Sequence, residues 1–85
     1  MAITAPNWLT QHGGTLRPGV DRQSWFVLFD GEPQYVLRPA PASGEYTCTV
    51  TQTVNGRHVE KGGKYPSAED AIRGGLEELR QALGW

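Results

Sequence analysis

The sequence has little of what membrane proteins and disulfide-rich proteins require. Its 85 residues include one cysteine, Cys48, so no disulfide bond can form within the chain. The longest purely apolar run, residues 25–29, is far too short to span a bilayer. The first residues contain neither a cationic stretch nor an apolar segment of signal-peptide length. We therefore expect a protein without membrane contact that resides in the cytoplasm, where a single thiol stays reduced.

The chain also lacks an excess of charge of either sign. Eight lysines and arginines against nine acidic residues give a formal net charge of −1. Affinity for nucleic acid of any sequence depends on neutralising phosphates with lysine and arginine, so the overall charge does not favour it. The composition, 38% hydrophobic and 20% charged, is that of a globular protein. So short a chain builds one small core, and we predict a single domain over residues 1–85 that self-association would stabilise.

Groups that could carry catalysis or hold a metal are few. A thiol nucleophile would need Cys48 beside His58, but the strand alternation places Cys48 on an inward face and His58 on an outward face. A zinc site needs converging ligands, and one cysteine with two histidines shows no paired spacing. No phosphate-binding loop of the nucleotide-binding families occurs. We therefore predict a protein that is not an enzyme, with no catalytic residue, no metal and no cofactor.

The clearest feature that is present is an amphipathic helix from Ser67 to about Leu83. Its apolar side chains recur three or four residues apart and fall within one arc of the helix. Ser67, with Asp70 three residues later, forms the pattern of a helix N-cap. Gly75 lies on the apolar arc, which indicates close approach of the helix to a sheet. Gly74 points nearly the opposite way, where either a surface position or a contact with a partner chain would explain a glycine.

Two hairpins are predicted before this helix. Residues 24–29 and 35–38 are expected to pair across a four-residue turn at residues 30–33, with Pro39 and Pro41 ending the second strand. Residues 46–54 alternate threonine with other side chains, which is typical of a strand with one buried face. The turn Asn55-Gly56 should then pair this strand with residues 57–61, so that Thr53 lies opposite His58.

Together these elements predict an α+β fold: a small antiparallel sheet of about four to five strands in two hairpins, with the C-terminal helix packed on one face. Two interpretations of the first twenty-two residues remain open. Residues 6–12 form a short helix that is followed by an edge strand at residues 15–17, or the whole segment is extended.

The second half of the chain resembles known nucleic-acid-binding domains in the order of its motifs. The match consists of Asn55-Gly56-Arg57, Gly62-Gly63 and the helix start at residues 68–71. In this order it is similar to the three-stranded arm-binding domains of phage integrases and to AP2-type DNA-binding domains, and through Gly62-Gly63-Lys64 it looks like double-stranded-RNA-binding domains. The resemblance implies a sheet or helix start that contacts nucleic acid through cationic and aromatic residues.

The first hairpin is the predicted working surface, because both of its faces carry large apolar side chains. A four-residue turn places on one face Trp25, Val27, Phe29, Val36 and Arg38, and on the other Phe26, Leu28, Tyr35 and Leu37. A single helix covers one face only. The Trp25 face is then covered by Trp8 and Leu9, forms a dimer or partner interface, or stacks an unpaired base.

These observations predict a non-enzymatic binding or assembly module that self-associates through the Trp25 face as a homodimer or with a protein partner. The alternative hypothesis is a small nucleic-acid-binding domain. It would use the sheet face and the cationic residues around its edge, namely Arg38, Arg57, His58, Lys61 and Lys64. Residues 38–65 carry a net charge of +2 and residues 67–85 carry −2, so the charge is segregated along the chain.

Overall fold

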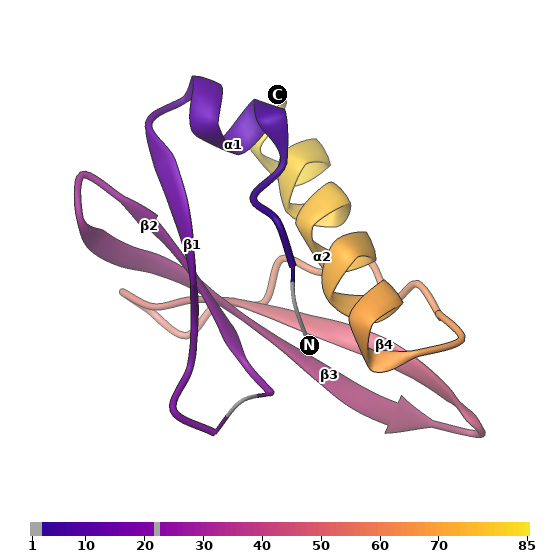
Figure 1. The fold of residues 1–85 in the computed structure, drawn as a ribbon. Coiled ribbons are helices and arrows are strands. Elements are labelled where there is room, and N and C mark those ends of the chain that lie inside the picture. The colour runs from indigo at the N-terminus through magenta and orange to yellow at the C-terminus, as the bar shows by residue number, and fades with distance from the viewer. Residues whose placement is uncertain (1–2, 22) are drawn as a thin grey trace.

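The computed structural model describes residues 3–21 and 23–85, which form one antiparallel sheet and two helices (Figure 1). The elements in chain order are α1 (Asn7–Gln11), β1 (Gly14–Pro18), β2 (Trp25–Phe29), β3 (Glu32–Ala42), β4 (Glu45–Gln52) and α2 (Ala68–Leu83). The strands lie in the order β1-β2-β3-β4. Figure 1 shows α2 over β3 and β4, with α1 beside the C-terminal end of α2. The predicted α+β fold is confirmed, including the short N-terminal helix and the edge strand after it.

Helix α2 begins and ends as its sequence predicts. The Ser67 hydroxyl accepts a hydrogen bond from the backbone N–H of Asp70 at 3.1 Å, so Ser67 is the N-cap. Gly84 ends the helix in the left-handed conformation, with φ of 76°. A Cβ at Gly75 would lie 2.4 Å from the Cys48 sulfur. The predicted close approach of this helix to the sheet is confirmed.

Gly74 lies close to a side chain of the same chain. A Cβ at this position would lie 2.1 Å from Cζ of Tyr65. The Tyr65 hydroxyl donates a 2.6 Å hydrogen bond to Glu78, a carboxylate that is only 7% exposed. This bond raises the pKa of Tyr65 to about 12, because it favours the protonated phenol. The second Glu78 oxygen accepts the backbone N–H of Lys61, so the loop before α2 is fixed to the helix.

Strand β3 does not end at the prolines, and the prediction of a short strand is wrong. Pro39 and Pro41 both lie within β3 and are paired with β4. Tyr46, opposite Pro41, exchanges its backbone hydrogen bonds with Tyr65 on the side away from β3. Because Pro41 stands at a position that donates nothing to β4, its missing N–H is not needed. Pairing with β2 reaches only to Leu37, so both prolines face no strand on their other side.

The first hairpin has a two-residue turn and a bulge, so the predicted four-residue turn is wrong. Asp30 and Gly31 both have positive φ, 54° and 78°, as the tight turn of a hairpin requires. Phe29 therefore pairs with Glu32, and the extra residue Gln34 then shifts the register by one. Because side chains alternate along a strand, this shift exchanges the two faces of the rest of β3 relative to the prediction.

The second hairpin is shorter than expected. Thr51, rather than Thr53, lies opposite His58, and this is an isolated bridge without a continuous strand. The difference from the predicted register is two residues, which leaves every side chain on its predicted face. Cys48 is accordingly buried on the inward face, as predicted, with 1% exposure.

The core lies on one side of the sheet. Leu9 of α1 and the apolar side of α2 pack against inward residues of β2, β3 and β4. The fully or nearly fully buried members are Leu9, Trp25, Val27, Leu37, Cys48, Val50, Ala71, Ile72, Leu76 and Leu79. Both helices thus cover the same sheet face, and within the described residues neither helix packs on the opposite one.

Candidate functional site

The predicted Trp25 face is the core face, and its interpretation as an exposed interface is wrong. Trp25 is 7% exposed and Val27 is fully buried. Phe29, on the same face, packs edge-on against Trp85 with ring centroids 5.7 Å apart. Leu9 lies in the same cluster, so the alternative in which the N-terminal segment covers this face is confirmed.

The bulge places Val36 and Arg38 on the opposite face, away from Trp25. Val36 pairs directly with Phe26, and Leu28 is two residues further along β2 on the same side. We call this surface the uncovered face. Its members are Arg17, Phe26, Leu28, Val36, Arg38, Thr49, Thr51 and His58.

One row of side chains crosses the uncovered face from edge to edge. Directly paired residues on neighbouring strands share a face, and here five such positions follow one another. The row is Arg17 on β1, Phe26 on β2, Val36 on β3, Thr51 on β4 and His58 after the Asn-Gly turn. It begins and ends with a side chain that carries or can carry positive charge, and its centre is apolar.

The uncovered face is not an exposed apolar patch. Leu28 is only 7% exposed, and Phe26 and Val36 are partly buried by their neighbours. The large hydrophobic side chains with high exposure are Val20, Val54 and Trp85, none of which belongs to this face. The face is instead a mixture of partly exposed apolar groups, threonine hydroxyls and arginines.

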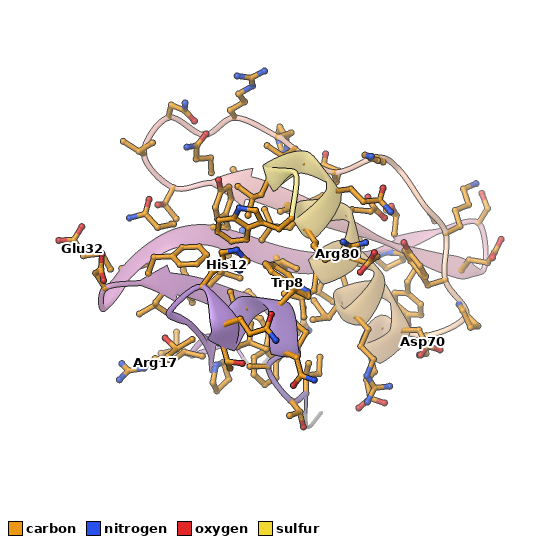
Figure 2. All side chains as sticks on the ribbon, turned by 90° about the horizontal axis from the view of Figure 1, so that it is seen from above. Trp8, His12, Arg17, Glu32, Asp70 and Arg80 are labelled. Carbon is orange, nitrogen blue, oxygen red and sulfur yellow. The ribbon has the colours of Figure 1, made fainter. Side chains whose placement is uncertain are left out.

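The arginines of the uncovered face differ from those of α2 in their ionic partners. On α2, Arg73 pairs with Glu69 and Asp70, and Arg80 pairs with Glu77. Among the described residues, neither Arg17 nor Arg38 forms an ion pair. Figure 2 shows Arg17 at the opposite end of the molecule from Asp70. The positive charge of this face is therefore available to an anionic ligand.

Asp21 is the acidic neighbour of Arg38. Its carboxylate accepts hydrogen bonds from the backbone N–H groups of Ser24 and Gln23 and from the Ser24 hydroxyl, at 2.8 to 3.0 Å. These bonds lower the pKa of Asp21 to about 2, and the charge of Arg38 contributes a smaller part. The carboxylate is mainly committed to the turn between β1 and β2, so it offsets the charge of Arg38 only in part.

The other predicted cationic residues are dispersed. His58 lies on the uncovered face, and Arg57 is exposed in the Asn-Gly turn next to it. Lys61 reaches the other way, because its ammonium donates to Gln81 of α2 at 2.8 Å. Lys64 is exposed in the loop before α2. The structure thus brings Arg38 and His58 together on one face but leaves Lys61 on the helix side.

The polar groups around His58 do not form a catalytic relay. Both the Thr51 hydroxyl and the Glu60 carboxylate approach the same ring nitrogen, Nδ1, at 3.4 Å. A relay would place the nucleophile and the acid on different ring nitrogens. Glu60 also accepts the backbone N–H of Val50 at 2.7 Å, which closes the outer edge of β4. Glu60 therefore satisfies a backbone N–H at the edge of β4, and the His58 side chain beside it is exposed to solvent.

Other sites offer less chemistry. Burial raises the pKa of Cys48 to about 12, so its thiol is a poor nucleophile. In the part of the chain that the structure describes, no three histidine, cysteine or acidic side chains gather as metal ligands. Nor does any described helix have the length and apolar character needed to cross a membrane.

A cavity of about 240 Å³ lies between the N-terminal segment and α2, lined by Thr4, Pro6, Trp8, Arg73, Leu76 and Glu77. Arg73, which lines this cavity, already forms ion pairs with Glu69 and Asp70 of α2.

Arg17 and Phe26 were missed as candidate binding residues. Arg17 lies on a short edge strand whose conformation the sequence leaves open. Phe26 is correctly predicted on the face opposite to Trp25, but that face is predicted to be the one that the helix covers. The signal that could have revealed the bulge is Pro33, since proline within a strand is confined to edges, strand starts and bulges.

Comparison of the chain with protein-family models, with curated proteins and with solved structures finds no match. The strand order that resembles the integrase arm-binding domains is also not reproduced, because residues after Asn55-Gly56 form two isolated bridges, at His58 and Tyr65, instead of a third strand. The function must therefore be argued from the uncovered face itself.

Proposed function

We propose that this protein is a non-enzymatic binding module whose uncovered face binds nucleic acid. The observation that supports this proposal is the contrast in ion pairing: the arginines of α2 pair with acidic residues of the same helix, whereas Arg17 and Arg38 form no ion pair with any residue that the structure describes. The site of action that we propose is the cytoplasm, where the single thiol Cys48 would stay reduced.

The chemistry of the face suits a phosphate backbone. Arginine binds phosphate through a planar fork of N–H donors, and each phosphate that is neutralised releases counterions. Thr51 and His58 add polar groups next to the cations, and Phe26 supplies an aromatic ring between them. The acidic residues of α2 lie on the opposite side of the sheet, so they do not face a ligand bound here.

Fluorescence anisotropy with short labelled oligonucleotides, at increasing salt concentration, tests this proposal. We expect binding at low salt that weakens steeply as salt rises, because the affinity comes from released counterions. The double substitution Arg17→Gln and Arg38→Gln should reduce the slope of log K against log salt by about 2, or about 1 for each lost phosphate contact.

The matched control is Arg73→Gln, which removes another exposed arginine, this one from the helix side of the molecule. We expect the salt slope of this variant to equal that of the unmodified protein. Absence of binding at low salt, or an equal loss in the control and in the double variant, contradicts the proposal.

Self-association through the same face is the second candidate. The observation that favours it is the adjacency of Phe26 and Val36, two partly exposed apolar side chains that a second copy would bury. Such a dimer would bring the arginines of the two copies close together, which costs electrostatic free energy because like charges repel. Sedimentation at high micromolar concentration tests it: a dimer that Val36→Asp dissociates supports self-association, and a strict monomer removes it.

A further inference from the structure

The uncovered face offers a path across the strands rather than along them. The row from Arg17 to His58 crosses four gaps between neighbouring backbones. At about 4.8 Å for each gap, the row spans roughly 19 Å. A path of this length suits a few nucleotides, near the lower end of the site sizes of about 4 to 16 nucleotides known for single-strand-binding sheets.

This path includes an aromatic ring that is partly exposed. Phe26 lies on β2, an inner strand, directly between Arg17 and Val36. Aromatic rings on a sheet bind nucleic acid by stacking on the flat side of a base. In a duplex that side is already stacked on neighbouring base pairs, so only an unpaired base can lie on Phe26.

The architecture also disfavours a duplex ligand. The major groove of duplex DNA is entered by a helix or by a two-stranded ribbon that protrudes from the protein. Here both helices pack on the other face of the sheet, and the uncovered face carries only side chains of paired strands. A sheet face with a partly exposed aromatic ring and cations beside it suits a flexible single strand.

Building on the proposed function, we infer that the ligand is a single-stranded nucleic acid that crosses the strands, stacks one base on Phe26 and places its phosphates at Arg17 and Arg38. Arg17 is the direct neighbour of the ring on β1, and Arg38 follows Val36 two residues later on the same face. The His58 side chain, 62% exposed, ends the path beside Thr51.

The substitution Phe26→Leu tests this inference, because it removes the ring and keeps an apolar side chain. Three probes are compared: a single-stranded oligonucleotide, the duplex of the same sequence, and heparin, a polyanion without bases. We expect the unmodified protein to prefer the single strand over the duplex. Phe26→Leu should weaken single-strand binding about tenfold or more and leave heparin binding unchanged.

Two further variants control for folding. Phe29→Leu makes the same change on the same strand but on the core face, and should leave single-strand affinity unchanged. Phe26→Tyr keeps a ring that can stack and should retain the affinity. A loss of single-strand affinity in a folded Phe26→Tyr variant would contradict the inference, whether or not Phe26→Leu folds. Circular dichroism of each variant establishes that it is folded.

The outcomes separate the inference from the proposed function. If neither heparin nor any oligonucleotide binds at low salt, the proposed function itself fails. If the protein binds duplex as tightly as single strand and Phe26→Leu has no effect, nucleic-acid binding stands and the stacking inference is overturned. A loss of single-strand affinity in Phe29→Leu equal to that in Phe26→Leu would also overturn it.

Discussion

At the scale of single residues, the adjacent glycines of α2 are required by different neighbours. Gly75 allows the helix to lie against the Cys48 sulfur, and Gly74 accommodates the ring of Tyr65 on the other side. The loop before α2 is fixed by the same ring, because the Tyr65 hydroxyl is bonded to the buried carboxylate of Glu78. Each glycine lowers the intrinsic helix propensity of α2, but each is needed because a larger side chain would collide with a neighbouring residue.

We predict that Gly74→Ala destabilises the protein. Alanine at an open helix position gains about 1 kcal/mol over glycine. Here its Cβ would meet Tyr65, and overpacking of this kind costs about 1 to 3 kcal/mol. Urea unfolding measures the change, and the control is the same substitution in a Tyr65→Ala background. There the collision is absent, so Gly74→Ala should raise the free energy of unfolding by about 1 kcal/mol. An equal effect in both backgrounds contradicts the prediction.

At the scale of elements, the bulge in β3 decides which side chains enter the core. Gln34 is the extra residue between the pairs Leu28 with Pro33 and Val27 with Tyr35. Downstream of it, Leu37 is fully buried and Arg38 is exposed. If Gln34 instead occupied a regular position opposite Val27, each of these side chains would point to the opposite face.

We predict that deletion of Gln34 leaves a protein that still unfolds cooperatively, because Val27 would still pair with Tyr35 and Trp25 with Leu37 in a regular hairpin. The Thr53 N–H would lose its acceptor, the Gln34 carbonyl, so the free energy of unfolding should fall by about 0.5 to 1.5 kcal/mol. The control is Gln34→Ala, which retains the bulge and should change the free energy of unfolding by no more than about 0.5 kcal/mol. Urea unfolding followed by tryptophan fluorescence measures both. A deletion variant without a cooperative transition contradicts the prediction.

At the scale of the whole molecule, aromatic contacts join the two ends of the described chain. Trp85 stacks on His12 with ring centroids 3.8 Å apart, and its ring also lies near Trp8 and Phe29. In Figure 2, Trp8 and His12 project from α1 toward the end of α2. These contacts help to hold α1 against the core, where its residue Leu9 is fully buried.

We predict that Trp85→Ala lowers the free energy of unfolding by about 1 to 2 kcal/mol, since each aromatic pair contributes about 0.5 to 1.5 kcal/mol. The ring is 40% exposed, so the loss should remain below that of a core substitution. The control is Val54→Ala, which truncates a hydrophobic side chain that is 77% exposed and should have almost no effect. Thermal unfolding of the three proteins provides the comparison. Equal melting temperatures for Trp85→Ala and the unmodified protein contradict the prediction.

The sequence by itself determined the elements whose causes are local. The cap at Ser67, the apolar arc of α2 and the inward position of Cys48 follow from neighbouring residues along the chain. The existence of both hairpins follows in the same way from the Asp-Gly and Asn-Gly turns. The sequence also implied that a single layer of helix leaves one sheet face bare.

Which face is bare was decided only by the tertiary structure. The choice depends on one extra residue, Gln34, and the spacing of apolar side chains in this hairpin suits either face, because both carry large hydrophobic groups. Packing of α1, α2 and three strands around Trp25 fixes the choice, and those contacts join residues far apart in the chain. Arg17, Phe26 and Arg38 consequently meet on the outside, since side chains alternate and the core already holds their neighbours.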